Sequence, residues 1–175
     1  PGTAGKKYRL ATDHELQIYR SASDYLEIKR AELREKWGFD PVPDESLTRV
    51  PISFGVINVW VYGMNTWGDL FNARQKLALI TFVEKVRQAQ VELLAEGMEK
   101  EWAKVVECYL SIILSRHSSY NTILCWWEPL GERGFNLFGR QAIPMVFDYS
   151  EQNPTEITTG SWPQQIDITY DIIHF

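Results

Sequence analysis

A long apolar run interrupted by one glycine most constrains what this chain can fold into. Residues 73–96 are predicted to form a helix, because apolar side chains recur there at helical spacing, at Leu77, Ile80, Val83 and Val86. Gly97 stands where a helix end is favoured, and a further helix is predicted over 98–116. So short a break favours antiparallel neighbours. The sequence therefore predicts a helical hairpin over residues 73–116, at the centre of a mainly α, helical domain.

The second helix of this hairpin carries an apolar face of its own. Val106 and Ile113 lie beside that face, which consists of Trp102, Val105, Tyr109 and Ile112. His117 follows Arg116 at the predicted end of the helix. Cationic side chains there complement the helix dipole, so we expect no special chemistry of His117.

One further helix is predicted near the N-terminus, over residues 12–37. Thr12 and Glu15 have the spacing of a capping box, and Gly38 is placed to end the helix. Residues 1–11 are expected to form a loose arm. The chain begins without methionine, which indicates a fragment excised from a longer protein.

The remaining segments are predicted to be short or irregular. Residues 50–61 are rich in β-branched and aromatic side chains, which favours an extended segment. Residues 117–160 are interrupted by glycine and proline and are expected to form a structured loop region. Residues 161–175 leave two alternatives open. Ser161 can cap a terminal helix, but the alternation of isoleucine and tyrosine over 166–172 is equally typical of a strand.

Length, composition and net charge limit the kinds of protein that this sequence can encode. The 175 residues are enough for one domain, and they need no metal or disulfide to hold a core. The two cysteines, Cys108 and Cys125, have no metal-site spacing, which fits a reducing cytoplasm. A net charge of −5 argues against a domain that grips nucleic acid with its whole surface. No apolar run is long enough to span a membrane.

Two stretches are candidate interaction surfaces. The first is the glycine-punctuated loop before the hairpin, with Tyr62 and Trp67. The second is the stretch 116–141, where aromatic residues, including the adjacent Trp126 and Trp127, alternate with possible phosphate contacts at Arg116, Arg133 and Arg140. Two adjacent tryptophans cannot point the same way from an extended backbone. Either both are covered by the core and the loop, or one is left for another domain or for nucleic acid.

Catalytic and metal-binding motifs are absent from the sequence. There is no nucleotide-binding glycine motif, no zinc-protease motif and no paired cysteine motif. No nucleophile elbow occurs either. We therefore assign no catalytic residue, no metal ligand and no cofactor to this segment.

Several stretches, in order, resemble one protein family. They are GKKYRLAT at 5–12, PVPDESL at 41–47, YGMNTWGDLFNARQKLALITF at 62–82, YNTILCWW at 120–127 and FGRQAIPMVFDYSEQNP at 138–154. These blocks are similar to the central segment of the large adenine-specific DNA methylases that carry a zinc-ribbon and an N-terminal conserved domain of unknown function.

This resemblance implies an inserted helical segment between two halves of an S-adenosylmethionine-dependent DNA methyltransferase. In that family the cofactor motif precedes this region and the catalytic motif follows it. The tetrapeptide Asn153-Pro154-Thr155-Glu156 lacks the second proline and the aromatic residue of the catalytic motif. The expected role is therefore non-catalytic: placement of target DNA or packing of domains, with the methyltransferase halves and duplex DNA as partners. The alternative is a protein–protein interaction module that docks on the methyltransferase core or on another partner.

Overall fold

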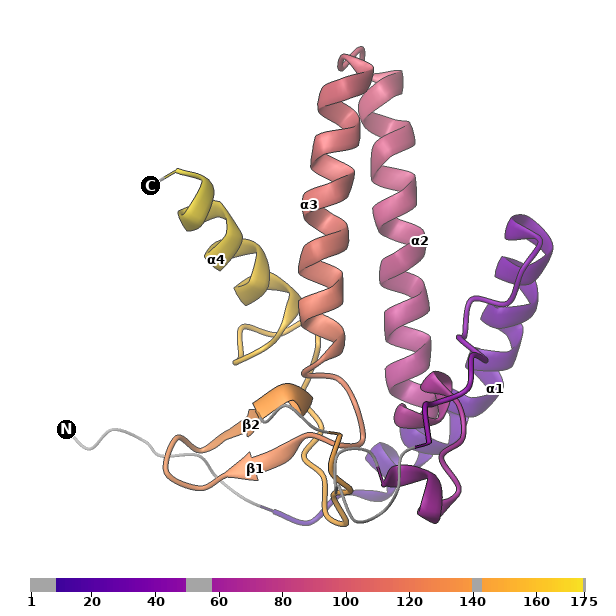
Figure 1. Ribbon diagram of the computed structural model, residues 1–175, viewed down its shortest axis with the longest axis vertical. Helices are drawn as coiled ribbons and strands as arrows, with labels where there is room; N and C mark the ends of the chain where they lie inside the picture. Colours follow the sequence, from indigo (N-terminus) through magenta and orange to yellow (C-terminus); the bar gives the residue numbers. More distant parts are fainter. Residues whose placement is uncertain (1–8, 50–57, 140–142, 175) are drawn as a thin grey trace.

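The computed structural model describes residues 9–49, 58–139 and 143–174, and helices dominate it (Figure 1). The α-helices are α1 (Asp13–Trp37), α2 (Ala73–Ala95), α3 (Lys100–Ser118) and α4 (Trp162–Ile173). Short 3-10 helices are η2 (Val59–Tyr62), η3 (Trp67–Leu70) and η4 (Leu137–Gly139). Strands β1 (Trp126–Glu128) and β2 (Arg133–Phe135) pair antiparallel, with Trp127 opposite Gly134. The prediction of a mainly α fold is confirmed.

Local sequence signals set the ends of α1. The Thr12 side chain accepts a hydrogen bond from the Glu15 N–H at 3.3 Å, and the Glu15 carboxylate accepts one from the Thr12 N–H at 2.7 Å. This capping box satisfies two N–H groups that have no partner within the helix. The helix ends at Gly38, whose φ of 78° is a left-handed conformation that glycine adopts without a Cβ clash. Residues 1–8 of the predicted arm lie outside the described residues.

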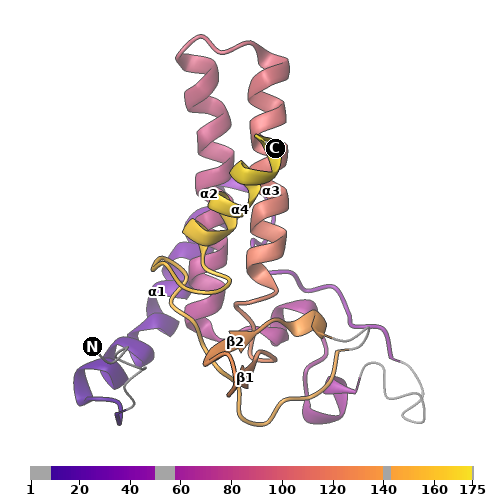
Figure 2. The same cartoon turned by 90° about the vertical axis from the view of Figure 1, so that its left-hand side faces the viewer.

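The central hairpin consists of α2 and α3. Asn72 caps α2, since its side chain accepts a hydrogen bond from the Gln75 N–H and the Gln75 side chain accepts one from the Asn72 N–H, each at 2.9 Å. Gly97 makes the turn with a φ of 91°. The two helices then run back along each other, and their loop end projects beyond the rest of the molecule (Figures 1 and 2).

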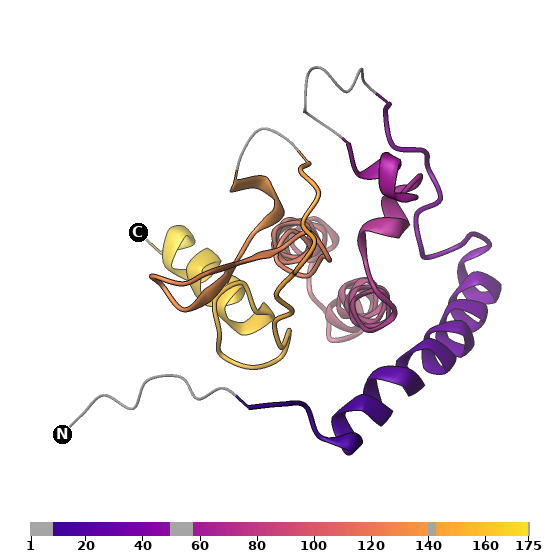
Figure 3. The same ribbon diagram turned by 90° about the horizontal axis from the view of Figure 1, so that it is seen from below.

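The other two helices lie on opposite sides of the hairpin. Viewed from below, α2 and α3 are seen end-on, with α1 beyond α2 and α4 beyond α3 (Figure 3). One core cluster joins α1 to α2 through Leu26, Leu33, Val42 and Ile80. A second cluster holds the loops at the base of the hairpin, and it comprises Leu47, Val59, Leu70, Leu124, Leu137 and Ile143. Burial of these side chains is the main contribution to stability.

Three predicted segments are clarified by the structure. The extended segment over 50–61 is wrong where it is described, because Val59–Tyr62 is a 3-10 helix, and residues 50–57 lie outside the described residues. The loop region 117–160 contains the β1–β2 hairpin, which was not predicted. At 161–175 the structure selects the helix, since Ser161 accepts a hydrogen bond from the Gln164 N–H at the start of α4.

Candidate functional site

Helix α3 has two apolar faces, and only one of them is covered. Ala103, Ile113 and His117 are buried on the covered face. The other face carries the residues singled out in the sequence, and each keeps a large exposed fraction: Trp102 63%, Val105 41%, Tyr109 42% and Ile112 60%. Their spacing of three, four and three residues is that of a coiled-coil seam. We call these four residues the α3 seam.

Trp126 and Trp127 are adjacent in the extended strand β1, where successive side chains leave opposite faces of the strand. The Trp126 ring packs on Phe135 of the paired strand, with ring centroids 4.8 Å apart. The Trp127 ring lines a polar cavity of about 520 Å³ together with Arg133 and Gln152. Both indoles are more than a third exposed, so the core covers neither completely.

The three candidate arginines do not form one phosphate-binding surface. Arg133 donates a hydrogen bond to the Glu128 carboxylate at 2.6 Å, so its charge is already compensated. Arg116 is exposed near the end of α3, and it makes no ion pair with another described residue. Arg140 lies outside the described residues. Of the three candidate arginines, Arg116 is the one that is described, exposed and outside any ion pair with a described residue.

The loop that carries Tyr62 and Trp67 is fixed by hydrogen bonds to the segment after α1. The Gly68 N–H donates to the Pro43 carbonyl at 3.0 Å, and the Trp67 N–H donates to the Glu45 carbonyl at 3.1 Å. A Cβ at Gly68 would lie 2.6 Å from the Pro43 oxygen, so this approach requires glycine. Tyr62 and Trp67 remain 52% and 39% exposed on this hydrogen-bonded loop.

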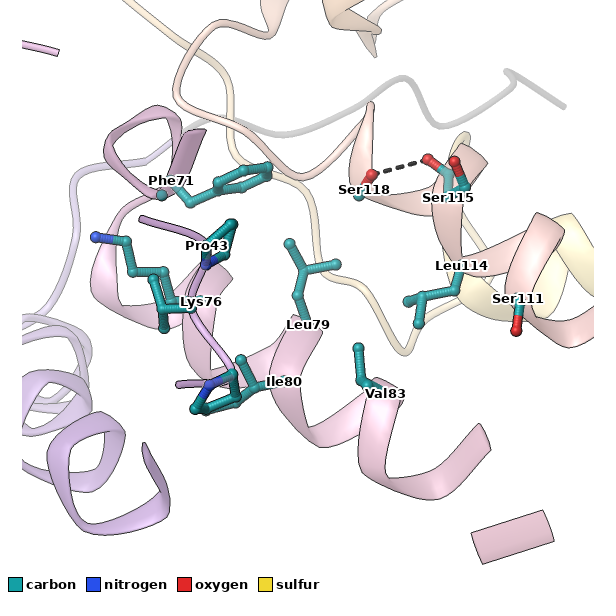
Figure 4. A pocket seen from close by; sticks show the side chains of 13 residues that line it. Pro43, Phe71, Lys76, Leu79, Ile80, Val83, Ser111, Leu114, Ser115 and Ser118 are labelled. Carbon is teal, nitrogen blue, oxygen red and sulfur yellow. Dashed lines mark hydrogen bonds between the residues drawn. The ribbon is translucent and has the colours of Figure 1, made fainter. Parts of the chain in front are cut away.

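An apolar cavity of about 380 Å³ lies between this loop and the hairpin. Figure 4 shows Phe71, Leu79 and Leu114 pointing into it from the loop, α2 and α3. Lys76 lines the cavity, but its ammonium group points away from the centre (Figure 4). The Ser118 hydroxyl on the opposite wall donates to the Ser115 carbonyl at 2.8 Å. The interior of this cavity therefore offers apolar contact and little polar chemistry.

A polar region lies on the other side of the hairpin base. Two cavities, of about 520 and 450 Å³, share Glu151, Gln152 and Asn153 as lining residues. Trp127, Arg133 and Gln164 line the first, and Arg74, Gln75 and Asn121 line the second. We call these two adjoining cavities the amide groove. The structure thus brings the predicted Trp127 and Arg133 together with glutamines that no sequence motif had marked.

His117 departs from its predicted role as a cation at a helix end. Its ring is fully buried, and Nδ1 lies 2.9 Å from the Gly160 carbonyl, which requires a proton on that nitrogen. Phe82 and Trp162 pack edge-on against the ring. Burial lowers the pKa of His117 below its ordinary value, so the neutral imidazole is the form that the core accepts.

The buried imidazole makes stability depend on pH. Unfolded His117 titrates near pH ~6.5 and the folded side chain below that. Above the pKa of unfolded His117 the imidazole is neutral in both states, and the free energy of unfolding does not depend on its protonation. As the pH falls from the unfolded pKa towards the folded pKa, the free energy of unfolding decreases by at most about 1.4 kcal/mol per pH unit. We expect the melting temperature to fall from pH 7 to pH 5, and His117→Gln to flatten this profile. Calorimetry across pH checks this, with the exposed His14→Gln as control; parallel profiles for wild type and His117→Gln would contradict it.

The described residues offer little for covalent or metal chemistry. Burial raises the pKa of the Cys125 thiol to about 11, which leaves it unreactive, and Cys108 is an isolated exposed thiol. Within residues 9–49, 58–139 and 143–174, no group of His, Cys, Asp or Glu side chains could hold a metal ion. None of the helices described there is both long and apolar enough to cross a membrane.

Comparison with known proteins identifies no relative of this chain. No protein-family model matches the chain, and no curated protein or solved structure is significantly similar to it.

Proposed function

We propose that this chain is a non-catalytic docking domain of an S-adenosylmethionine-dependent DNA adenine methyltransferase, which packs against the methyltransferase halves of a longer parent protein in the cytoplasm. The resemblance of five collinear sequence blocks supports this class of parent protein. Docking is favoured over direct DNA placement because the candidate arginines are dispersed, with Arg133 paired to Glu128. The alternative is a protein–protein interaction module that docks on the methyltransferase core or on another partner. Such a module would use the same exposed surface of α3.

The α3 seam is the observation that carries the proposal. Its four large apolar side chains are exposed on α3. The loop end of the hairpin that α3 forms with α2 projects from the body of the molecule (Figure 2). A contiguous row of exposed apolar residues at heptad spacing is typical of a helix that packs against a partner helix. The loop with Tyr62 and Trp67 adds a second exposed aromatic surface, at the base of the hairpin.

The cofactor of such an enzyme does not fit the residues described. A methyltransferase core binds its cofactor at a glycine-rich turn between a strand and a helix, whereas β1 and β2 here form an isolated antiparallel pair joined by a turn. The S-adenosylmethionine site therefore belongs to the methyltransferase halves, and no chemical step is assigned to this chain.

Side-chain footprinting tests the docking role directly. We expect hydroxyl radicals to oxidise Trp102 and Tyr109 rapidly in the isolated chain, and at least about tenfold more slowly in the parent protein, where a partner surface would cover the seam. The exposed Leu130, on the turn between β1 and β2, serves as an internal reference. Equal oxidation rates of the seam residues in both proteins would refute docking through α3.

Direct DNA binding is expected to be weak. Of the candidate arginines, Arg116 alone is described as exposed and unpaired, and one such cation neutralises about one phosphate. If DNA contact runs through these arginines, the logarithm of the binding constant should therefore change with the logarithm of the salt concentration with a slope no steeper than about −1. Fluorescence anisotropy with a labelled duplex between about 50 and 200 mM salt measures this slope. A slope several times steeper that becomes shallower in Arg116→Ala would restore the DNA-placement role.

A further inference from the structure

The apolar cavity at the base of the hairpin is bounded by three separate parts of the chain. Its lining includes Pro43 and Phe71 from the segments before α2, Leu79 and Val83 from α2, and Leu114 from α3. We call it the hairpin cavity, and its volume is about 380 Å³ (Figure 4). An apolar cavity of about 150 Å³ already admits benzene. The hairpin cavity is therefore large enough for a small organic molecule with two fused rings.

The side chains that line this cavity keep apolar surface uncovered. Phe71, Leu79 and Leu114 point into the cavity, and all three are only half-buried (Figure 4). Water next to such surface is released when an apolar ligand enters, and this release favours binding. Contact with all three walls at once would cover more of this surface than contact with one helix face could.

Polar groups lie at the edge of the hairpin cavity and not in its interior. The ammonium group of Lys76 points away from the centre (Figure 4), and Ser111 and Ser115 are exposed on α3. The hydroxyl of Ser118 already donates to the Ser115 carbonyl at 2.8 Å. A charged ligand inside the cavity would lose its hydration without gaining a partner. The lining therefore favours an uncharged ligand.

Hydrogen bonds hold the walls of the cavity in place without a ligand. The Gly68 N–H donates to the Pro43 carbonyl at 3.0 Å, which joins the loop before α2 to the segment after α1. A Cβ at Gly68 would also lie 2.9 Å from Cγ1 of Val42, so the two segments approach this closely only with glycine. A site that is already formed binds a rigid ligand without the cost of ordering a loop.

The ring of Phe71 narrows the class of ligand further. Aromatic rings in contact gain free energy beyond the burial of their apolar surface. We propose that the hairpin cavity binds a small uncharged aromatic molecule, up to the size of two fused rings, which contacts Phe71, Leu79 and Leu114. The cavity shares no lining residue with the α3 seam, so this site and the docking role stand or fall separately.

Binding of indole to the full chain tests the proposal, because indole is uncharged and has two fused rings. NMR of the methyl-labelled chain measures both affinity and location. We expect a dissociation constant of about 1 mM or lower, with the largest shifts at the methyl groups of Leu79 and Leu114. The absence of shifts would overturn the proposal. Equally large shifts at Val105 and Ile112 of the α3 seam would also overturn it, since indole would then bind any exposed apolar surface.

The carboxylate analogue of the same ring tests the preference for an uncharged ligand. We expect indole-3-carboxylate to bind about tenfold more weakly than indole, because its carboxylate would have to be desolvated. Binding as tight as that of indole would contradict the assignment of an uncharged ligand.

A cavity-filling substitution locates the ligand independently. Val83→Phe places a ring in the hairpin cavity and should weaken indole binding by about tenfold or more. The matched control is Val91→Phe, the same exchange on α2 at a position that is 64% exposed and outside the cavity. Melting temperatures of both variants separate loss of binding from loss of fold, and the methyl shifts of the unsubstituted chain locate the site without any substitution. A folded Val83→Phe variant with unchanged affinity would refute binding in this cavity.

Discussion

Gly160→Ala is expected to lower the free energy of unfolding by about 3 kcal/mol. Gly160 has a φ of 82°, a left-handed conformation that costs alanine about 1 kcal/mol or more. The new methyl group would also lie 2.3 Å from the Tyr120 ring, and the displacement of that ring adds about 1–3 kcal/mol. Urea denaturation followed by circular dichroism measures the change.

The physical reason for so large an effect is that Gly160 joins two ends of the fold. Its carbonyl accepts the hydrogen bond from buried His117 at the end of α3, and its N–H donates to the Gln164 side chain at the start of α4 at 2.6 Å. Movement of this residue disturbs both contacts.

The control for Gly160→Ala is Gly97→Ala. Gly97 has a similar φ, 91°, but a Cβ there would meet nothing within 4 Å. It therefore reports the backbone cost alone, expected at about 1 kcal/mol. Equal losses for the two variants would show that Tyr120 accommodates the methyl group and that the close contact is not important for stability.

The parts of the fold that the sequence predicts are those that nearby residues determine. The capping box of Thr12 and Glu15 and the glycines at 38 and 97 specify helix ends through contacts within a few residues. Segment 59–62 behaves differently. Its β-branched and aromatic residues favour an extended chain, but burial of Val59 against Leu70 and Leu124 stabilises a 3-10 turn. Tertiary packing therefore decides the structure of this segment.

In the candidate site, too, the sequence predicts some residues, whereas tertiary contacts decide the rest. Aromatic and basic composition led to Trp127 and Arg133, which do line one cavity. Composition gives no information about the charge partner of Arg133, because Glu128 reaches it only through the pairing of β1 with β2. Composition also gives no sign that Gln152 lines a cavity or that His117 is neutral. Both features depend on contacts with residues that are distant in sequence.

The apolar faces of α3 illustrate why periodicity alone is ambiguous. The sequence shows that Trp102, Val105, Tyr109 and Ile112 share one face, and the structure shows that α2 and α4 cover the neighbouring face instead. Helix periodicity gives the relative positions of side chains but not the direction in which the helix is turned. Within the described residues, the face with these four side chains stays largely exposed.

If the chain docks through the α3 seam as proposed, Trp102→Lys combined with Ile112→Lys should abolish that docking and lower the methylation activity of the proposed parent protein by about 100-fold or more. Full burial of an apolar side chain contributes about 1.5–3 kcal/mol, and docking would bury the roughly 60% of each side chain that is still exposed; a lysine in its place must also be desolvated. Together the two changes remove at least about 3 kcal/mol of association free energy. Methylation assays of the parent protein measure the activity, and footprinting of the α3 seam measures the docking.

Both residues are about 60% exposed in the isolated chain, so its melting temperature should change little. The control is Asp24→Lys, an exposed position of α1 where one substitution changes the net charge by the same amount as the two lysines do. We expect the control to retain activity, because charge alone does not disrupt an apolar contact on another helix. Full activity in the double variant would mean that the α3 seam faces solvent in the parent protein, and docking would then have to use the loop with Tyr62 and Trp67 instead.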